Sequence, residues 1–479
     1  MSTARQTAMG PMVALRDLLH RAGIRPRLRN REAGLLLLVA FSLLIGWLSL
    51  ASYQAGRLTV GDPSILVIYV ALLTGVHVAF VMTGRRTDQV LLPVTAMLGG
   101  LSLLLMARLP QGLAALSLPG LDLGLAPLQL LWISGAFILL ALLAIVVRND
   151  NWLREYKYTW AATGIGLLLL VFIFGPEVNG SRLSIAIGPV SGQPSELLKV
   201  ILVVFLAAYL AENRTLLARI STRIGPISLP PLPYMLPMLA MLAIALAIVI
   251  VQRDLGAALL FFSVFLTMLY AATRRRAYVA LGLLLFMGGA LVLYQLFPHV
   301  RTRVDIWLDP YADPLGAGYQ ILRALYAFGR GGVLGTGLGA GLPQVGDVPA
   351  IPAIHTDFVF AGLAEELGML GALAIVFLYG VIAERGLRIA VQAADDFRAL
   401  LAVGLTLVVV IQAAIIIGGN LKLVPLTGIT LPFISYGGSS LFANAIVIGL
   451  LLALSDRGVE PPPPPSSGSR FGFGRAGAG

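Results

Sequence analysis

The chain has 479 residues, of which 58% are hydrophobic and 12% are charged, and its formal net charge is +11. Soluble domains carry charge on about a quarter of their residues, so this composition excludes an ordinary water-soluble protein. The absence of cysteine excludes disulfides, zinc–thiolate sites and cysteine nucleophiles. On a membrane protein, excess positive charge reports which side of the bilayer the loops occupy, so we expect no nucleic-acid partner.

Apolar stretches long enough to cross a bilayer recur along the chain, since a spanning helix needs about 20 such residues. We predict an all-α, polytopic membrane protein with about twelve transmembrane helices. No small-residue cleavage site precedes the first span, so it is interpreted as a retained anchor. The predicted spans are residues 33–53, 63–83, 89–107, 128–147, 158–175, 196–211, 234–251, 255–272, 277–297, 357–383, 398–418 and 434–454.

Basic residues gather on one side of this arrangement. If the N-terminus is cytoplasmic, 24 of the 34 lysines and arginines fall in cytoplasmic segments. Because Lys and Arg resist translocation, we predict that both termini are cytoplasmic. The basic tail of residues 1–32 could also attract anionic membrane lipids, although a topological signal alone explains it. Residues 456–479, which include Pro461 to Pro465, are predicted to be a disordered cytoplasmic tail.

Residues 298–356 form the long loop between the ninth and tenth predicted spans, and the orientation places it outside. The spacing of apolar residues over 318–329 predicts a helix lying at the membrane interface. Asp309 and Asp313 each precede a proline, which predicts turn geometry around both carboxylates. Taken alone, this segment favours ordinary turn chemistry over catalysis.

Polar residues at membrane depth are expensive unless they are paired or line a wet cavity. Glu196 and Lys199 lie three residues apart at the start of the sixth span and can form a pair. Helix–helix hydrogen bonds explain any one such residue about as well as function does. The polar set near the predicted outer face comprises Arg182, Glu196, Lys199, Asp254, His355, Asp357, Glu365, Glu366, Gln412, Asn420, Lys422, Ser435, Tyr436, Ser439 and Ser440.

Taken together, these segments resemble the SEDS glycosyltransferases, the RodA and FtsW family of peptidoglycan polymerases. The similar segments follow the family's order and spacing from about residue 89 to residue 455. They are residues 179–182, 193–199, 254–260, 309–320, 355–358, 364–368 and 425–440. The resemblance divides the chain into a basic tail (1–32), two additional N-terminal spans (33–88), a ten-span catalytic core (89–455) containing the outer catalytic loop (298–356), and the C-terminal tail.

The resemblance implies a peptidoglycan polymerase of the bacterial plasma membrane that joins lipid II-linked disaccharide-peptide units into β-1,4 glycan strands in cell elongation or division. It implies that Asp313 is the catalytic carboxylate and that Asp309 is secondary. It also implies a class B penicillin-binding protein as transpeptidase partner. The residues assigned to substrate binding are Arg182, Glu196, Lys199, Asp309, His355, Asp357, Glu366, Ser435 and Tyr436.

Several positions depart from the family pattern. Ser184 stands where the family commonly has Trp, Arg253 stands where it has Pro, and the usual Glu before His355 is missing. The sequence contains no specific ligand cluster for a metal, although a divalent cation such as Mg²⁺ or Mn²⁺ could assist the reaction. Two other functions stay open: a lipid II transporter or flippase, and a non-catalytic scaffold for a penicillin-binding protein.

Overall fold

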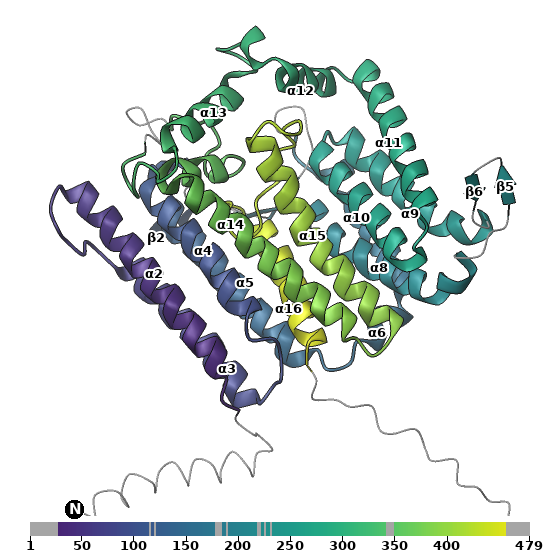
Figure 1. The fold of residues 1–479 in the computed structure, drawn as a ribbon, viewed down its shortest axis with the longest axis horizontal. Helices are drawn as coiled ribbons and strands as arrows, with labels where there is room; N and C mark the ends of the chain where they lie inside the picture. Colours follow the sequence, from purple (N-terminus) through teal and green to yellow (C-terminus); the bar gives the residue numbers. More distant parts are fainter. Residues whose placement is uncertain are drawn as a thin grey trace, which may run out of the picture.

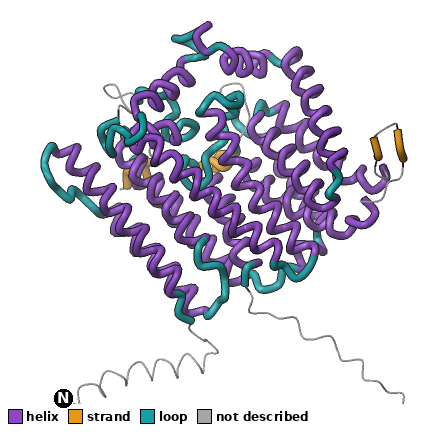
Figure 2. Tube along the Cα trace, in the orientation of Figure 1, coloured by secondary structure: helices purple, strands orange, loops and turns teal. Residues whose placement is uncertain are grey.

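The computed structural model describes residues 27–114, 116–118, 121–177, 184–187, 190–217, 222–224, 227–229, 232–341 and 349–456. Its helices lie side by side in one bundle, and the short strands form three separate two-stranded hairpins (Figures 1 and 2). The prediction of an all-α, polytopic membrane protein is confirmed. The hairpins, which the sequence did not indicate, are β1(Leu116–Leu118) with β2(Leu121–Leu123), β3(Ile185–Ile187) with β4(Val190–Gly192), and β5(Thr222–Ile224) with β6(Ile227–Leu229).

Eleven helices of the described part have the length and hydropathy to cross a membrane, and α16(Gly438–Leu454), at the twelfth predicted span, is apolar but shorter. Each predicted span therefore coincides with a helix. The eleven are α2(Asn30–Ala55), α3(Ser64–Thr83), α4(Leu91–Arg108), α5(Leu125–Val146), α7(Lys157–Phe174), α8(Pro194–Leu217), α9(Leu232–Val251), α10(Leu255–Thr273), α11(Arg276–Leu296), α14(Val359–Val391) and α15(Asp396–Asn420). A short helix, α6(Asn151–Glu155), precedes α7.

Local residues explain where several helices end. Gly56 and Gly84 follow α2 and α3 with φ of 63° and 67°, the left-handed geometry that glycine adopts without strain and that closes a helix. Between α9 and α10 the chain makes a tight turn in which Arg253 has φ 64° and the carboxylate of Asp254 accepts the backbone N–H of Ala257. The two helices are therefore separate spans joined by a capped turn.

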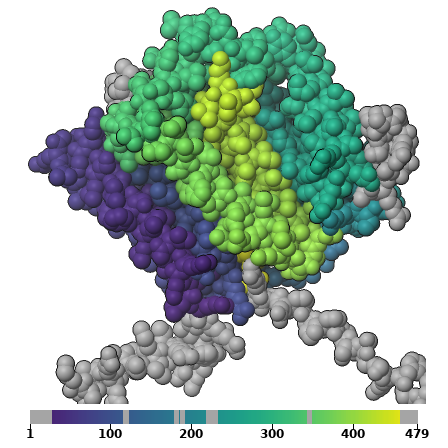
Figure 3. Space-filling model, in the orientation of Figure 1, coloured from purple at the N-terminus to yellow at the C-terminus, as the bar shows by residue number. Residues whose placement is uncertain are grey.

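The additional pair α2 and α3 lies along one flank of the bundle, shown in purple in Figure 3. α2 packs on α4, and α3 packs on α5. Gly100 of α4 permits this contact, because a Cβ there would lie 2.3 Å from Leu43 of α2. The hydroxyl of Tyr69 in α3 donates to the carbonyl of Ala96 in α4 at 2.6 Å. The pair is therefore fitted to the core helices and is not a loose extension.

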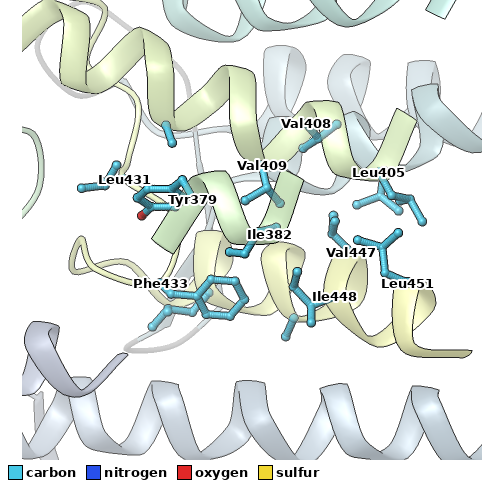
Figure 4. Close-up of a cluster of buried hydrophobic side chains, with 14 of the residues drawn as sticks. Tyr379, Ile382, Leu405, Val408, Val409, Leu431, Phe433, Val447, Ile448 and Leu451 are labelled. Atoms are coloured by element: carbon cyan, nitrogen blue, oxygen red, sulfur yellow. The ribbon is translucent and has the colours of Figure 1, made fainter. Parts of the chain in front are cut away.

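Branched and aromatic side chains of α14, α15 and α16 fill the middle of the core. Figure 4 shows Tyr379 and Ile382 of α14 facing Val408 and Val409 of α15, with Val447, Ile448 and Leu451 of α16 beside them. All of these side chains are buried. The hydroxyl of Tyr379 donates to the carbonyl of Pro432 at 2.6 Å, which ties the segment before α16 to this core.

The segment between α11 and α14 covers one end of the bundle, and the first and last described residues lie at the opposite end (Figure 1). It contains α12(Pro298–Leu308), the 3-10 turn η2(Pro310–Ala312) and α13(Tyr319–Gly331). The predicted helix at 318–329 is present as α13, whereas α12 was not predicted. Arg29 donates to the carbonyl of Arg85 at 3.2 Å, and Arg85 pairs with Asp456, the last described residue, so both described ends lie on one face.

Candidate active site

Asp313 lies in the tight turn between η2 and α13. Its Oδ1 accepts the backbone N–H of Gly316 at 3.0 Å, and its Oδ2 accepts the N–H of Ala317 at 2.8 Å. Gly316 is needed there, because a Cβ would lie 2.3 Å from Oδ2. The side chain is exposed at the end of the bundle. The turn predicted from Pro314 is therefore present, and it holds a solvated carboxylate in a defined orientation.

Asp309 lies between the last residue of α12 and the first residue of η2. Its Oδ1 accepts the backbone N–H of Tyr311 at 2.9 Å, so it is a turn cap like Asp313. Asp309 is also exposed. The two acids thus lie on one exposed loop and differ in the backbone groups they hold.

A buried polar cluster lies between α8, α15 and α16. The ammonium of Lys199 donates to Glu196 at 2.6 Å, to Gln412 at 2.8 Å and to Asn444 at 3.3 Å. Lys199 is 2% exposed, so its charge is satisfied entirely by these three partners. The predicted pair of Glu196 and Lys199 is therefore confirmed. Asn444 was missed, although an asparagine within an apolar span is itself a signal.

A second acid, Asp254, joins this cluster from the turn before α10. It accepts hydrogen bonds from Gln193 at 3.1 Å and Ser195 at 3.3 Å. Burial raises the pKa of the Asp254 carboxyl, against the opposing effect of its hydrogen bond from Ala257. Glu196, Lys199 and Asp254 line a small cavity of about 30 Å³. The cluster is therefore polar and not completely filled by protein.

Arg303 of α12 connects the outer loop to this buried cluster. Its Nη1 donates to the carbonyl of Leu426 at 3.1 Å. Burial lowers the pKa of Arg303, and the negative charges of Asp357 and Asp254 oppose that shift. The guanidinium is thus half-buried near two carboxylates from different segments. The sequence suggested Arg301 or Arg303 as a cation for the leaving pyrophosphate, but it did not predict α12 or the distant segments that Arg303 meets.

His355 and Asp357 meet the segment before α16, as their shared position near the outer face suggested. Asn420 donates to the carbonyl of Asp357 at 2.9 Å, and the backbone N–H of Tyr436 donates to the carbonyl of His355 at 2.8 Å. The rings of His355 and Tyr436 lie 5.9 Å apart. Burial raises the pKa of Asp357 and lowers that of His355. At neutral pH the imidazole is therefore uncharged.

Ser435 lies at the same contact between residues 355–357 and the segment before α16. Its hydroxyl donates to the carbonyl of Thr356 at 2.5 Å and accepts the backbone N–H of Leu431 at 2.8 Å. Its side chain is thereby committed to the fold, and its contribution to a site is to fix the backbone of residues 355–357.

Several buried polar atoms around Arg303 and Asp357 have no hydrogen-bond partner among the described residues. Buried polar groups are nearly always paired, so such a set marks a place where a polar ligand or water belongs. The set comprises Nε2 of His299, Nδ1 of His355, Oδ1 of Asn420 and Oγ1 of Thr427.

The remaining predicted residues lie elsewhere. Glu366 accepts a hydrogen bond from Arg108 at 3.1 Å and thereby joins α14 to α4, so it is not part of the Lys199 cluster. Arg182 lies outside the described residues. Within the described ranges, no hydrogen bond or ion pair connects Asp313 to the buried cluster, and no group of three His, Asp or Glu side chains is close enough to hold a metal ion. The divalent cation stays a prediction.

Known proteins are similar to this chain in sequence and in fold. The family profile named for FtsW, RodA and SpoVE, described as a cell cycle protein, matches residues 88–458. The peptidoglycan glycosyltransferase RodA of Mycobacterium tuberculosis is 38% identical over 90% of this chain and 92% of its own. Only 21 residues follow residue 458, and the chain from residue 88 onwards is less than 90% of the whole. The match to this RodA therefore includes part of the additional N-terminal pair.

Other relatives match a shorter part of the chain. A probable peptidoglycan glycosyltransferase FtsW of Legionella pneumophila is 37% identical over 66% of this chain and 79% of its own. A solved chain described as "Structural coordination of polymerization and crosslinking by a peptidoglycan synthase complex" superposes with a TM-score of 0.60 and 28% identity, covering 77% of this chain and 98% of that one. The rod shape determining protein RodA of Thermus thermophilus gives a TM-score of 0.52 with 25% identity, covering 77% and 97%. The chain therefore belongs to the FtsW, RodA and SpoVE family of multi-pass membrane proteins, which includes peptidoglycan glycosyltransferases.

Proposed function

We propose that this protein is a peptidoglycan glycosyltransferase that polymerises lipid II at the outer face of the bacterial plasma membrane, in cell elongation or division. Relatives 35–38% identical over most of the chain are named peptidoglycan glycosyltransferases. The observation that carries the proposal is the arrangement at one end of the bundle. An exposed loop carboxylate, Asp313, shares that end with a buried cation, Lys199, and a half-buried one, Arg303.

In the proposed reaction, the 4-hydroxyl of the acceptor sugar attacks the anomeric carbon of the donor with inversion. The new glycosidic C–O bond forms as the bond to the undecaprenyl pyrophosphate breaks, and the hydroxyl proton passes to Asp313. A positioned general base typically contributes about 10² to 10⁴ in rate. The hydrogen bonds from Gly316 and Ala317 orient the carboxylate, and its exposure leaves further lone pairs for the acceptor.

The leaving pyrophosphate needs positive charge. Arg303 and Lys199 supply it in this proposal, with Arg182 as a third cation. The unpartnered atoms of His299, Asn420 and Thr427 near Arg303 add donors and acceptors for a phosphate or its water shell. Glu196 keeps Lys199 oriented towards the cavity. His355, Asp357, Ser435 and Tyr436 form the wall of this region. Glu366 of α14 lies outside it, where it accepts a hydrogen bond from Arg108 of α4.

A transpeptidase partner belongs to the same proposal. The solved chain superposed above comes from a complex that coordinates polymerization and crosslinking. We infer that this protein assembles with a class B penicillin-binding protein, and that both of its termini are cytoplasmic. The excess of arginines at the end of the bundle opposite Asp313 supports that orientation.

The decisive experiment follows fluorescent lipid II in proteoliposomes that contain the purified protein and its candidate partner, with transpeptidation blocked by a β-lactam. Glycan chains resolved on a gel would support the polymerase. Movement of lipid II between leaflets without polymer would instead identify a transporter. Polymer that persists when this chain is omitted would identify a scaffold and overturn the proposal.

A further inference from the structure

A cavity lies at the end of the bundle opposite Asp313, where α2 and α14 approach the loop between α3 and α4. Its volume is about 490 Å³. Seven arginines line it, three at the start of α2, two in the α3–α4 loop and two near the end of α14. They are Arg27, Arg29, Arg31, Arg85, Arg86, Arg385 and Arg388.

Acidic neighbours balance only part of this charge. Glu32 pairs with Arg29, Asp456 with Arg85, and Glu384 with both Arg385 and Arg388. Asp88, the one acid that lines the cavity, lies 3.7 Å from Arg385. Four carboxylates therefore face seven guanidinium groups, and no ion pair within the described ranges involves Arg27, Arg31 or Arg86.

Two of the arginines are buried parts of the wall. Arg29 is 2% exposed and donates to Thr87, to Glu32 and to the carbonyl of Asp88. Arg85 is 8% exposed and donates to the carbonyl of Ile145. In both, the buried Nε has no hydrogen-bond partner among the described residues. A topological signal needs only surface arginines, whereas here two buried guanidinium groups form part of the wall of a cavity that exposed arginines also line, which is the construction of an anion site.

We propose that this cavity binds the phosphate headgroup of an anionic phospholipid from the inner leaflet. The site lies where membrane helices end, at the depth of the headgroups, and Val90, Ile389 and Leu454 add apolar wall beside the arginines. Guanidinium groups bind phosphate through paired N–H donors, as they do carboxylate, and phosphate is the anion that a phospholipid headgroup carries. A bound lipid would bridge α2, the α3–α4 loop and α14, and so would fasten the additional N-terminal pair to the core.

The test uses the full-length protein in neutral detergent and a fluorescent phosphatidylglycerol. The triple variant Arg31→Gln, Arg86→Gln, Arg388→Gln removes three exposed cavity arginines and spares Arg29 and Arg85. The control Arg154→Gln, Arg274→Gln, Arg276→Gln removes the same charge from exposed positions that do not line the cavity. Arginines near a membrane surface contribute enough to predict a loss of affinity between about tenfold and a hundredfold in the first variant.

Little change is expected in the control. Unlabelled phosphatidylglycerol should compete, whereas phosphatidylcholine should not. Equal losses in both variants would overturn the site, because they would show general surface attraction. Equal competition by soluble glycerol 3-phosphate would overturn the lipid assignment in favour of a free phosphate ligand. If the triple variant does not elute as a folded protein, Arg31→Gln and Arg388→Gln are measured singly against Arg154→Gln.

Discussion

Lys199 is a charged side chain buried inside the helix bundle. It is buried and satisfied by Glu196, Gln412 and Asn444, which come from three different helices. Lys199→Met removes the cation and leaves Glu196 without its partner. Removing one member of a buried pair costs about 3–5 kcal/mol. We expect a marked fall in apparent melting temperature and loss of polymerase activity.

The double variant Glu196→Gln, Lys199→Met provides the control for that prediction. Because neither charge is then stranded, its destabilisation should be smaller than the sum of the two single variants. Melting temperatures of all four proteins in the same detergent give the coupling. Strictly additive effects would show that the pair does not act as a unit.

Asp357 makes stability depend on pH. Its pKa is raised in the folded protein by burial, so the folded state holds the proton more tightly than the unfolded state does. Its contribution to stability is complete below the ordinary aspartate pKa of about 3.9 and is lost as pH rises through the folded-state pKa. As pH rises from 4.5 to 8, the free energy of unfolding should therefore fall less for Asp357→Asn than for the wild type. An exposed control, Asp62→Asn, should keep the wild-type slope, and an unchanged slope in Asp357→Asn would contradict this account.

Sequence reasoning reached the residues with a local signal. Glu196 and Lys199 are three residues apart on one helix, so their pairing could be predicted. The charged neighbours of Arg303 could not be predicted, because Asp254 and Asp357 come from different loops that only the folded bundle brings together. Ser435 and Glu366 were assigned to substrate, whereas the structure shows that each also has a structural partner. Hydrogen-bond partners of that kind depend on helix packing, which composition does not encode.

At the scale of elements, α14 is broken at Gly368, where φ is 69° and ψ is −172°. The glycine-rich segment after α13 is joined to this break by backbone hydrogen bonds. Met369 donates to Gly332 at 2.9 Å, and Gly337 donates to the carbonyl of Glu366 at 3.0 Å. Seven glycines between residues 329 and 341 favour flexible or tightly turned backbone, but they do not indicate its partner. The partner is the interior of α14, where the periodicity of the sequence alone predicts an unbroken helix.

Gly368→Ala tests this junction. A Cβ at Gly368 would lie 2.2 Å from the backbone nitrogen of Gly335, and alanine is strained at positive φ. We expect a destabilisation of about 1–3 kcal/mol, seen as a lower melting temperature. Gly380→Ala, on the same helix with open space around it, should be neutral or slightly stabilising. Equal melting temperatures for the two variants would contradict a required glycine at 368.

At the scale of the whole molecule, hydropathy predicted nearly the entire bundle, because a membrane span needs a long apolar run whatever its neighbours are. Hydropathy did not predict α12, a helix of mixed polarity. It also did not predict the hairpins, because strands of three residues are too short for a periodic signal. Hydropathy also could not predict that α2 and α3 lie on the flank of the bundle, because the order of helices around a bundle is set by their packing.

The absence of native cysteine makes the orientation directly measurable. Leu315→Cys places a thiol on the exposed loop beside Asp313, and Ala394→Cys places one between α14 and α15 at the opposite end. A membrane-impermeant maleimide should label the first in intact cells and the second only after permeabilisation. The reverse pattern would contradict cytoplasmic termini.

The central claim is that Asp313 is the catalytic base. Its most direct test is lipid II polymerisation by wild type, Asp313→Asn and Asp309→Asn, each reconstituted with the transpeptidase partner while transpeptidation is blocked. Asp309→Asn is the matched control, because it is the same change at an exposed turn cap in the same loop. We predict glycan chains from the wild type, a substantial yield from Asp309→Asn and none from folded Asp313→Asn. Undiminished polymer from Asp313→Asn would place the base elsewhere and contradict the account.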